Sequence, residues 1–480
     1  MNFSIIRYTI SWILKFEGLF LLLPSLVGLV YREYQAALVY ALTAAACLVC
    51  SLPLNRKRPA RFEMYPKEGF FAVALSWTIL SIVGAFPFVF TGDIPNYAEA
   101  LFETISGFTT TGASILEDVT RLTHAGLFWR SFTHWIGGMG VFVFIMAILP
   151  LMGGSTMNLM RAESTGPSVG KLVPKVKDTA KILYELYLGI TVAQVISLCF
   201  CGVSFFDSLL LTFGTVGTGG FGIRNDSLAS YSAAAQNVVT LFMVLSGINF
   251  TVYFCLLRRQ WKEAFSIEEV RWYLGIIAAS ALVITLNIFP RYASVPETLR
   301  HAFFQVGSVV TTTGYSTADF DQWPQLSKTI LLILMFIGAC AGSTGGGIKV
   351  SRILTLFKTI HKEISILAHP RLVKRIKMGG KTLPHEILRS INVFLAVYCV
   401  ILLSSILLIS VDNLDFTTNF SAVIAALNNI GPGFSLVGPT RNFSLYSDFS
   451  KVVLMFDMLA GRLELFPLLI LFTPSSWKKY

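Results

Sequence analysis

The sequence predicts an all-α polytopic membrane protein in which two extra N-terminal transmembrane helices precede four parallel repeats. Of its 480 residues, 54% are hydrophobic and only 14% are charged, whereas about a quarter of the residues in a soluble protein are charged. Glycine-centred breaks recur at four places between apolar segments. Several runs contain no Asp, Glu, Lys or Arg and are long enough to cross a bilayer, which takes about 20 helical residues; they are Phe70–Gly92, Ser131–Met160, Leu186–Phe206, Ser227–Leu257, Trp272–Pro290, Thr329–Ile348 and Ser390–Val411.

These runs exclude a soluble enzyme and a disordered chain. They also exclude an outer-membrane barrel, whose strands alternate in polarity over about 10 residues. The net charge of +11 is better explained by membrane topology than by nucleic-acid binding, because most lysines and arginines lie in segments that would share one side. These segments are the two chain ends and 53–67, 161–181, 258–271 and 349–389.

Loops rich in Lys and Arg remain in the cytoplasm. The pattern therefore predicts a multi-pass protein of the cell (inner) membrane with both termini cytoplasmic. The basic face would oppose anionic membrane lipid or an acidic partner, although fixing the topology is its simplest role. Acidic residues outnumber basic ones on the other face, which predicts an external entrance that concentrates cations.

Residues 1–53 are expected to form the two additional helices, near 8–31 and 36–52. The first lacks a small-residue cleavage site, so we interpret it as a retained span and not as a signal peptide. The rest of the chain divides into four units of one plan, in which a span is followed by a short semi-apolar stretch, a glycine-centred turn and a second span. The units are 68–153, 180–258, 271–360 and 388–475.

In each unit the middle stretch is too short to cross and must return on the face where it entered. Such a loop is tolerated at membrane depth only where it is buried in protein or lines a water-filled cavity. The four turns align without gaps on Gly112, Gly220, Gly314 and Gly433 as ALFETISGFTTTGAS (100–114), SLLLTFGTVGTGGFG (208–222), AFFQVGSVVTTTGYS (302–316) and SAVIAALNNIGPGFS (421–435).

A ring of backbone carbonyls from four such turns can replace the hydration shell of a cation, and glycine permits the backbone angles that turn carbonyls inward. The sequence therefore predicts four membrane–pore-loop–membrane repeats around one central pore. Taken singly, each turn could instead be an ordinary loop or a close-packing point between helices. The candidate filter residues are Thr110, Thr111, Gly112, Ala113, Thr218, Gly219, Gly220, Phe221, Thr312, Thr313, Gly314, Tyr315, Gly431, Pro432, Gly433 and Phe434.

The fourth turn departs most from the others in this alignment. Pro432 stands where the first and third turns have threonine, and it removes a backbone N–H. Strict fourfold coordination of an ion is therefore doubtful.

The motifs TTTGA, GTGGF, TTTGY and IGPGF resemble those of the Trk/Ktr/HKT superfamily of potassium transporters. The two additional N-terminal helices make the resemblance closer to the TrkH-type membrane subunit of the bacterial Trk system than to Ktr. The resemblance covers nearly the whole chain. It implies four unequal pore repeats, a carbonyl filter for K⁺ and potassium uptake across the cell membrane.

The run Ile337–Lys349, IGACAGSTGGGIK, contains five glycines. Each glycine costs about 1 kcal/mol relative to alanine in a helix, so this run cannot hold a continuous helix and should face the water-filled cavity. The resemblance implies an intramembrane gating loop here, and a packing notch of small residues is the alternative. The candidate gate residues are Gly338, Gly342, Ser343, Thr344, Gly345, Gly346 and Gly347.

Arg462 lies in the last predicted span, where a charge costs at least about 2.5 kcal/mol. Its spacing from Gly433 equals that of Ser343 from Gly314, so repeat symmetry places its guanidinium beside the loop, able to donate to loop carbonyls. The resemblance implies an energetic barrier to permeation in the closed state. A salt bridge to Asp457 or Glu464 is the alternative, although neither spacing is a favoured helical pair.

A rival function is that of a secondary K⁺ symporter coupled to Na⁺ or H⁺, but broken helices in such proteins usually occur as paired discontinuities of inverted repeats. An enzyme is not expected, because Asp457, Arg462 and Glu464 are the titratable residues found within the spans.

The glycine-rich stretches form neither a Walker loop nor a Rossmann fingerprint, so we expect no organic or covalent cofactor in this chain and no nucleic-acid partner. The resemblance implies a homodimer. It also implies a cytosolic TrkA-like regulatory subunit that binds NAD or adenine nucleotides and docks on the basic face.

Overall fold

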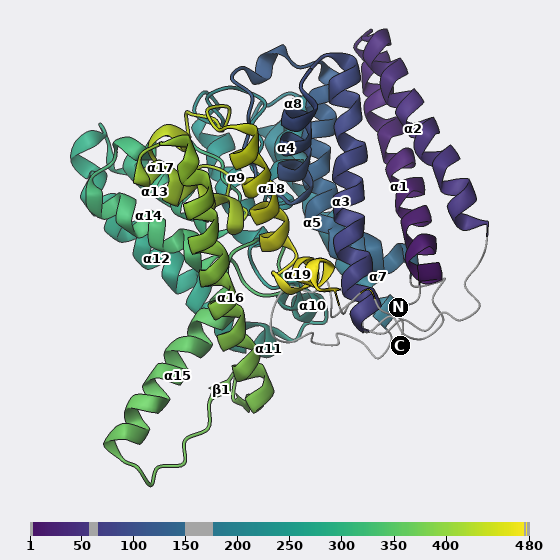
Figure 1. Ribbon diagram of the computed structural model, residues 1–480. Helices are drawn as coiled ribbons and strands as arrows, with labels where there is room; N and C mark the ends of the chain where they lie inside the picture. The colour runs from purple at the N-terminus through teal and green to yellow at the C-terminus, as the bar shows by residue number, and fades with distance from the viewer. Residues whose placement is uncertain (1–2, 57–65, 149–175, 475–476, 478–480) are drawn as a thin grey trace.

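The computed structural model describes residues 3–56, 66–148, 176–474 and 477. Predictions that concern the remaining positions, including most of the basic segments 53–67 and 161–181, lie outside the described residues. Figure 1 shows a helical molecule in which α1 and α2 lie together at one edge, while α15 and a small hairpin project from the opposite end of the body.

The chain runs through long helices, short helices and one two-stranded hairpin. The α-helices are α1 Phe3–Val30, α2 Tyr34–Asn55, α3 Pro66–Thr91, α4 Tyr97–Phe108, α5 His124–Ile148, α7 Val176–Phe200, α8 Phe205–Val216, α9 Ala233–Ser246, α10 Phe250–Leu257, α11 Trp261–Ser266, α12 Glu268–Ile288, α13 Val295–Val310, α14 Gln325–Ile337, α15 Val350–Ala368, α16 His385–Ile409, α17 Phe416–Leu427, α18 Asp448–Arg462 and α19 Phe466–Leu469. The antiparallel strands are β1 Lys377–Met378 and β2 Lys381–Thr382. Short 3-10 turns are η1 Val119–Arg121, η3 Phe289–Arg291, η4 Phe320–Gln322, η5 Ser410–Asp412, η6 Ser435–Val437 and η7 Ile470–Phe472.

Within the described ranges, six helices are long and apolar enough to cross a membrane. The α9–α10 pair is a further candidate, bent by 92° at a short break. Large apolar side chains such as Phe200, Leu286 and Leu407 are exposed on the outside of the molecule, whereas threonines and asparagines of the glycine-centred turns are fully buried. An apolar exterior around a polar interior suits a multi-pass membrane protein, because lipid solvates apolar side chains.

Small residues bring α1 and α2 together. A Cβ added to Gly18 would lie 2.9 Å from the backbone oxygen of Ala44. The hydroxyl of Ser25 donates to the backbone oxygen of Ala37 at 2.8 Å. Close backbone approach and interhelical hydrogen bonds are the means by which helices associate in lipid.

Four short helices, α4, α8, α13 and α17, end in the glycine-centred turns. Each has a side-chain cap at its N-terminus, where the first backbone N–H groups of a helix lack partners. The caps are Asn96, Ser204, Ser294 and Asp415. The capped helices fix the direction from which each turn enters the centre of the molecule.

Candidate functional site

The same backbone geometry recurs at the end of each short helix. The residue three places beyond the helix donates its N–H five residues back, in the pairs Thr111–Ser106, Gly219–Gly214, Thr313–Ser308 and Ile430–Ala425, at 2.8–2.9 Å. The residue before each donor has a positive φ of 54–57° (Thr110, Thr218, Thr312 and Asn429). The residue after it is a glycine with φ of 79–99° (Gly112, Gly220, Gly314 and Gly431).

This geometry corrects the register predicted for the fourth turn by two residues. Gly431, and not Gly433, occupies the position of Gly112, because both the hydrogen bonds and the positive φ recur there. Gly433 instead donates its N–H to Val437 at 2.7 Å, and the N–H of Phe434 donates to Ser421.

Pro432 therefore occupies the position of Ala113, not that of a threonine. The departures of the fourth turn are Asn429 and Ile430, which replace Thr110 and Thr111 of the first. The four turns, defined from here on as 109–113, 217–221, 311–315 and 428–432, are the equivalent segments.

The four turns close into a ring. A Cβ added to the glycine of one turn would collide with a backbone oxygen of the next turn, in the pairs Gly112–Gly219, Gly220–Thr313, Gly314–Ile430 and Gly431–Thr111. The last pair returns to the first turn, so each turn has two neighbours. Glycine is required at these positions both by its positive φ and by the close approach of a backbone carbonyl.

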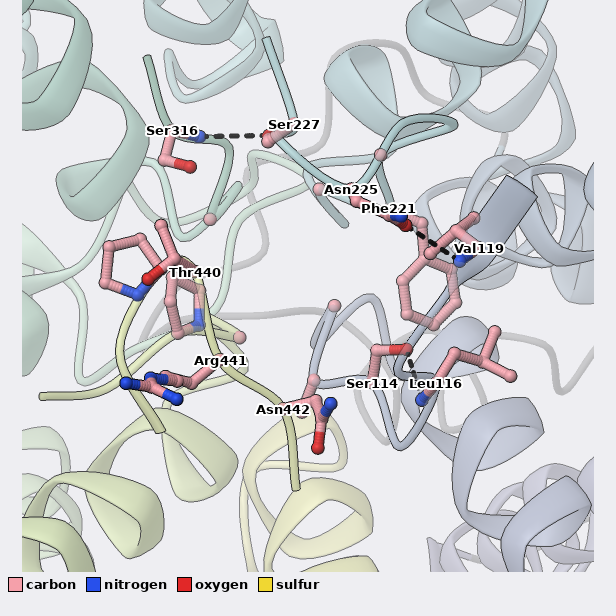
Figure 2. Close-up of a pocket in the computed structure, with 18 of the residues that line it drawn as sticks. Ser114, Leu116, Val119, Phe221, Asn225, Ser227, Ser316, Thr440, Arg441 and Asn442 are labelled. Atoms are coloured by element: carbon pink, nitrogen blue, oxygen red, sulfur yellow. Dashed lines mark hydrogen bonds between the residues drawn. The ribbon is translucent and has the colours of Figure 1, made fainter. Parts of the chain in front are cut away.

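A cavity of about 120 Å³ opens onto one side of the ring, and all four ring glycines line it. Figure 2 shows that residues from separate segments surround this opening and that hydrogen bonds tie the segments together: the N–H of Val119 donates to Asn225 at 2.8 Å, and the N–H of Ser316 donates to Ser227 at 3.2 Å.

The charged residues that line this cavity are one acid and three bases, Glu117, Arg130, Arg224 and Arg441. The acidic external entrance stays a prediction, since this cavity does not itself carry a net negative charge. Nearby, hydrogen bonds from the Thr120 hydroxyl and from Asn225 lower the pKa of Asp118 to about 2, so this carboxylate stays charged at neutral pH.

On the other side of the ring lies the glycine-rich loop between α14 and α15. The helix α14 stops at Gly338, which has a φ of 71°, and most of the following residues are buried. The N–H of Gly346 donates to the hydroxyl of Thr312, at 2.6 Å. This hydrogen bond connects the loop directly to the third turn.

The loop is also anchored to the break between α9 and α10. The N–H of Cys340 donates to the oxygen of Gly247, and the N–H of Phe250 donates to the oxygen of Gly342, both at 3.1 Å. Glu269 at the start of α12 accepts from the N–H groups of Ala341 at 2.7 Å and Ser351 at 3.1 Å. Both ends of the loop are therefore tied to neighbouring helices.

Arg462 reaches the loop from α18, and the hydrogen bond that the sequence predicts is present. Its Nη1 donates to the oxygen of Thr344 at 2.9 Å, and its Nη2 donates to the oxygen of Gly137 on α5 at 2.5 Å. The two acids considered as alternative partners bond elsewhere: Glu464 pairs with Arg352 at 2.5 Å, and Asp457 accepts from Ser405.

Comparison with known proteins gives consistent matches over the whole chain. The family model TrkH, described as a cation transport protein, matches residues 35–290 and 287–479. The chain belongs to the TrkH family. This TrkH-family chain is 38% identical over 97% of both chains to the Trk system potassium uptake protein TrkH of Escherichia coli strain K12. It is 31% identical over the full length of both chains to TrkG of the same strain.

The crystal structure of the potassium transporter TrkH from Vibrio parahaemolyticus matches the TrkH-family chain with a TM-score of 0.89 and 34% identity, covering all of both chains. Similarity at this level supports a common fold throughout.

Several polar residues around the TrkH-family site were not predicted from the sequence. The expectation that Asp457, Arg462 and Glu464 are the only charged residues within the spans is too narrow. Glu103 and Arg130 are buried and paired beside the first two turns. The signal for Glu103 was present, since it is the one charged residue in the four aligned blocks. Arg130 had no comparable signal. The α9–α10 break had one in Gly247, which ends α9, and in Asn249, whose side chain caps α10.

Proposed function

We propose that this chain mediates potassium uptake across the cell membrane through the ring of four turns. The observation that carries the proposal is the closed cycle of glycine–carbonyl contacts, because it arranges the backbone of four segments in one ring. The backbone oxygens of such a ring can replace the hydration shell of an ion. The relatives in Escherichia coli are named potassium uptake proteins, which supports K⁺ as the transported ion.

In this proposal the filter comprises Thr110–Ala113, Thr218–Phe221, Thr312–Tyr315 and Asn429–Pro432. The hydroxyl of Thr110 has no hydrogen-bond partner in the described part of the protein, which leaves it able to contact water or an ion. The four repeats 68–153, 180–258, 271–360 and 388–475 would surround a single pore, and residues 1–53 would lie outside it.

The loop Gly338–Gly347 and Arg462 would form the gate. The loop contacts the third turn through Gly346, and Arg462 holds the loop oxygen of Thr344. A guanidinium at this point repels cations that leave the filter. Opening would require the loop to move away from the ring. The hydrogen bond between Arg462 and Thr344 would then either break or move together with the loop.

Control would come from other subunits. The relatives are named as proteins of a Trk system, which supports association with other Trk components. We propose that this chain forms a homodimer and that the other component is a cytosolic regulatory subunit that binds NAD or adenine nucleotides. The projecting α15 and the hairpin, rich in Lys and Arg, are the proposed cytoplasmic docking region, and both termini would lie on the same side.

Flux into proteoliposomes tests the proposal. Purified protein should admit radioactive Rb⁺, used as a tracer for K⁺, down the Rb⁺ gradient. It should admit Na⁺ much more slowly down an equal Na⁺ gradient. Equal flux of both ions would refute the potassium filter. Rb⁺ uptake that occurs only with an inward Na⁺ or H⁺ gradient would establish the symporter instead.

A further inference from the structure

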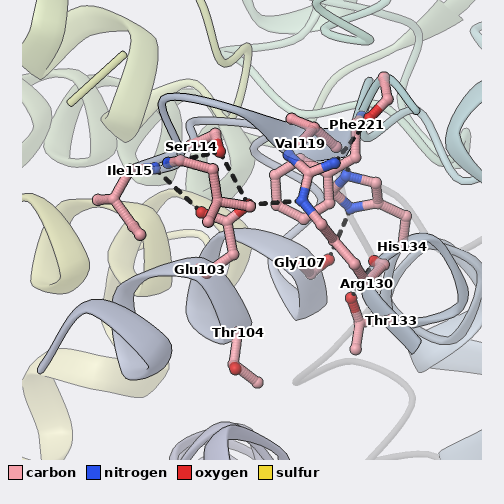
Figure 3. Close-up of polar contacts among 12 residues, drawn as sticks. Glu103, Thr104, Gly107, Ser114, Ile115, Val119, Arg130, Thr133, His134 and Phe221 are labelled. Atoms are coloured by element: carbon pink, nitrogen blue, oxygen red, sulfur yellow. Dashed lines mark hydrogen bonds and ion pairs between the residues drawn. The ribbon is translucent and has the colours of Figure 1, made fainter. Parts of the chain in front are cut away.

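Three buried polar side chains lie directly behind the first two turns (Figure 3). Glu103 is on α4, and Arg130 and His134 are one helical turn apart on α5. Their exposed fractions are 1%, 3% and 0%. Burying an ion pair costs desolvation energy that the pair often fails to recover, so the cluster calls for a role beyond stability.

Glu103 holds the outer end of the first turn. Its Oε1 accepts from the hydroxyl of Ser114 at 2.9 Å, and its Oε2 accepts from the N–H of Ile115 at 3.0 Å. Both donors follow Gly112 closely in the chain. The turn is thereby fixed against the short helix that precedes it.

Arg130 connects Glu103 to the second turn. Its Nε donates to Oε1 of Glu103 at 2.6 Å, and its Nη1 donates to the oxygen of Gly222 at 2.8 Å. The guanidinium carbon also lies 3.6 Å from the centre of the Phe221 ring, within the range of a cation–π interaction. One side chain therefore joins two turns from different repeats.

His134 adds a second link between the same two repeats. Its Nδ1 donates to the oxygen of Gly107, at the end of α4, at 2.8 Å. Its Nε2 accepts from the N–H of Phe221 at 3.2 Å. A Cβ added to Gly219 would strike the imidazole ring, so the ring supports the second turn from behind.

The second turn has particular need of such support. The turn and the residue that follows it, 217–222 or GTGGFG, contain four glycines, and glycine restricts the backbone least of all residues. The third turn supports it from another direction, because the hydroxyl of Tyr315 donates to the oxygen of Phe221 at 3.3 Å. Both backbone polar groups of Phe221 are thus engaged by side chains from other repeats.

We propose that Glu103, Arg130 and His134 are positioning residues that fix the first two turns and thereby set the preference for K⁺ over Na⁺. The proposal rests on the function proposed above. Selectivity depends on the number and spacing of the carbonyls around the ion. A glycine-rich turn without support could close around the smaller Na⁺, and the brace from α5 opposes this contraction.

The test compares Glu103→Gln and His134→Gln with Glu99→Gln in proteoliposomes. Glu99 is a matched control, since it lies one turn before Glu103 on α4 and pairs with Lys451 at 3.0 Å without contacting a turn. The measured quantity is the ratio of initial Rb⁺ influx to Na⁺ influx from one preparation. Misfolded protein lowers both fluxes together, so the ratio reports the filter and not the folded fraction.

We expect the ratio to fall by about tenfold in Glu103→Gln and His134→Gln, the effect of weakening one charged or buried hydrogen bond, and to stay at the unmodified value in Glu99→Gln. An unchanged ratio in both brace variants would overturn the proposal. An equal fall in Glu99→Gln would also overturn it, because the loss of any ion pair on α4 would then suffice. If the unmodified protein itself does not discriminate, the proposed function fails, and the two failures are distinguishable.

A double variant separates positioning from stability. Glu103→Met with Arg130→Met replaces the ion pair by apolar side chains of similar length, a change that cores often tolerate. The double variant should fold and conduct, yet it should lose selectivity because Gly222, Ser114 and Ile115 lose their partners. Retention of the full ratio in this variant would contradict a positioning role.

Discussion

Replacing Gly431 with alanine should impair ion uptake far more than the same replacement at Gly433. Gly431 has a φ of 99°, where other residues are strained by about 1–3 kcal/mol. Its added Cβ would lie 2.8 Å from the oxygen of Thr111 and 3.1 Å from the carbonyl carbon of Gly112. Because these atoms are backbone atoms of the ring, relief of the clash must widen or distort it.

At Gly433 the added Cβ would instead meet side-chain atoms of Ser421 and Val437, both at 2.8 Å, which can move without disturbing the ring. If the strain of about 1–3 kcal/mol at Gly431 adds fully to the free-energy barrier of transport, the rate of uptake should fall by about 5- to 150-fold, because about 1.4 kcal/mol corresponds to a tenfold change in rate. Gly433→Ala should retain most of the activity.

The assay is radioactive Rb⁺ uptake by cells that lack other potassium uptake systems, normalised to the amount of protein in the membrane. Gly433→Ala serves as the control for the general effect of a methyl group in this segment. A loss at Gly433 equal to or greater than the loss at Gly431 would refute the register derived from the hydrogen bonds and would restore the alignment on Gly433.

Four further outcomes are expected. Gly314→Asp should abolish selective Rb⁺ uptake, since a side chain cannot fit beside the oxygen of Ile430; unchanged selectivity would count against the filter. Arg462→Ala should raise basal flux without a regulatory subunit, whereas Arg462→Lys, which keeps the charge, should raise it less; lower flux in the alanine variant would contradict the barrier role. Glu269→Leu should also raise basal flux, because the loop N–H of Ala341 and the N–H of Ser351 at the start of α15 lose their acceptor at about 1–3 kcal/mol each; a leak no greater than that of the unmodified protein would exclude Glu269 as a loop anchor. Burial of Glu33 disfavours its charge, but hydrogen bonds from His124 and Ala125 outweigh this effect and lower its pKa below the ordinary value of 4.5. The stabilising contribution of this carboxylate is therefore present above pH 4.5 and is lost as the pH falls below it, so the Tm of Glu33→Gln should drop less than that of the unmodified protein on acidification from pH 6 to about pH 4. An identical drop in Tm would show that the carboxylate does not contribute.

The sequence was informative where local composition alone dictates structure. The helices α1 and α2 were predicted near their observed places, and Gly112, Gly220 and Gly314 were aligned in the register that the backbone geometry repeats. A helix-length apolar run and a recurring Thr/Gly-rich turn are both visible in the sequence. Arg462 was found because a charge within an apolar run is conspicuous. The spacing that placed it beside Ser343 was measured from Gly433; measured from Gly431 the same argument points to Gly345, and the observed hydrogen bond is to Thr344 between them.

The features that were missed depend on contacts between distant segments. IGPGF offers two glycines two residues apart, and only the hydrogen bond from Ile430 to Ala425 distinguishes them. The ion pair of Glu103 and Arg130 joins residues 27 positions apart, which no periodic pattern reveals. The bend at α9–α10 falls within an uncharged run that is long enough for a continuous span, and the loop forms hydrogen bonds on both sides of the break.

The most direct test of the central claim is the position of bound Rb⁺ in crystals of this protein, located by anomalous scattering. The account predicts Rb⁺ on the axis of the ring, surrounded by the turns that contain Gly112, Gly220, Gly314 and Gly431, and its absence from that place when Na⁺ replaces it. Rb⁺ bound away from the ring, or an equal occupancy of the ring by Na⁺, would contradict the claim that these four turns form a potassium filter.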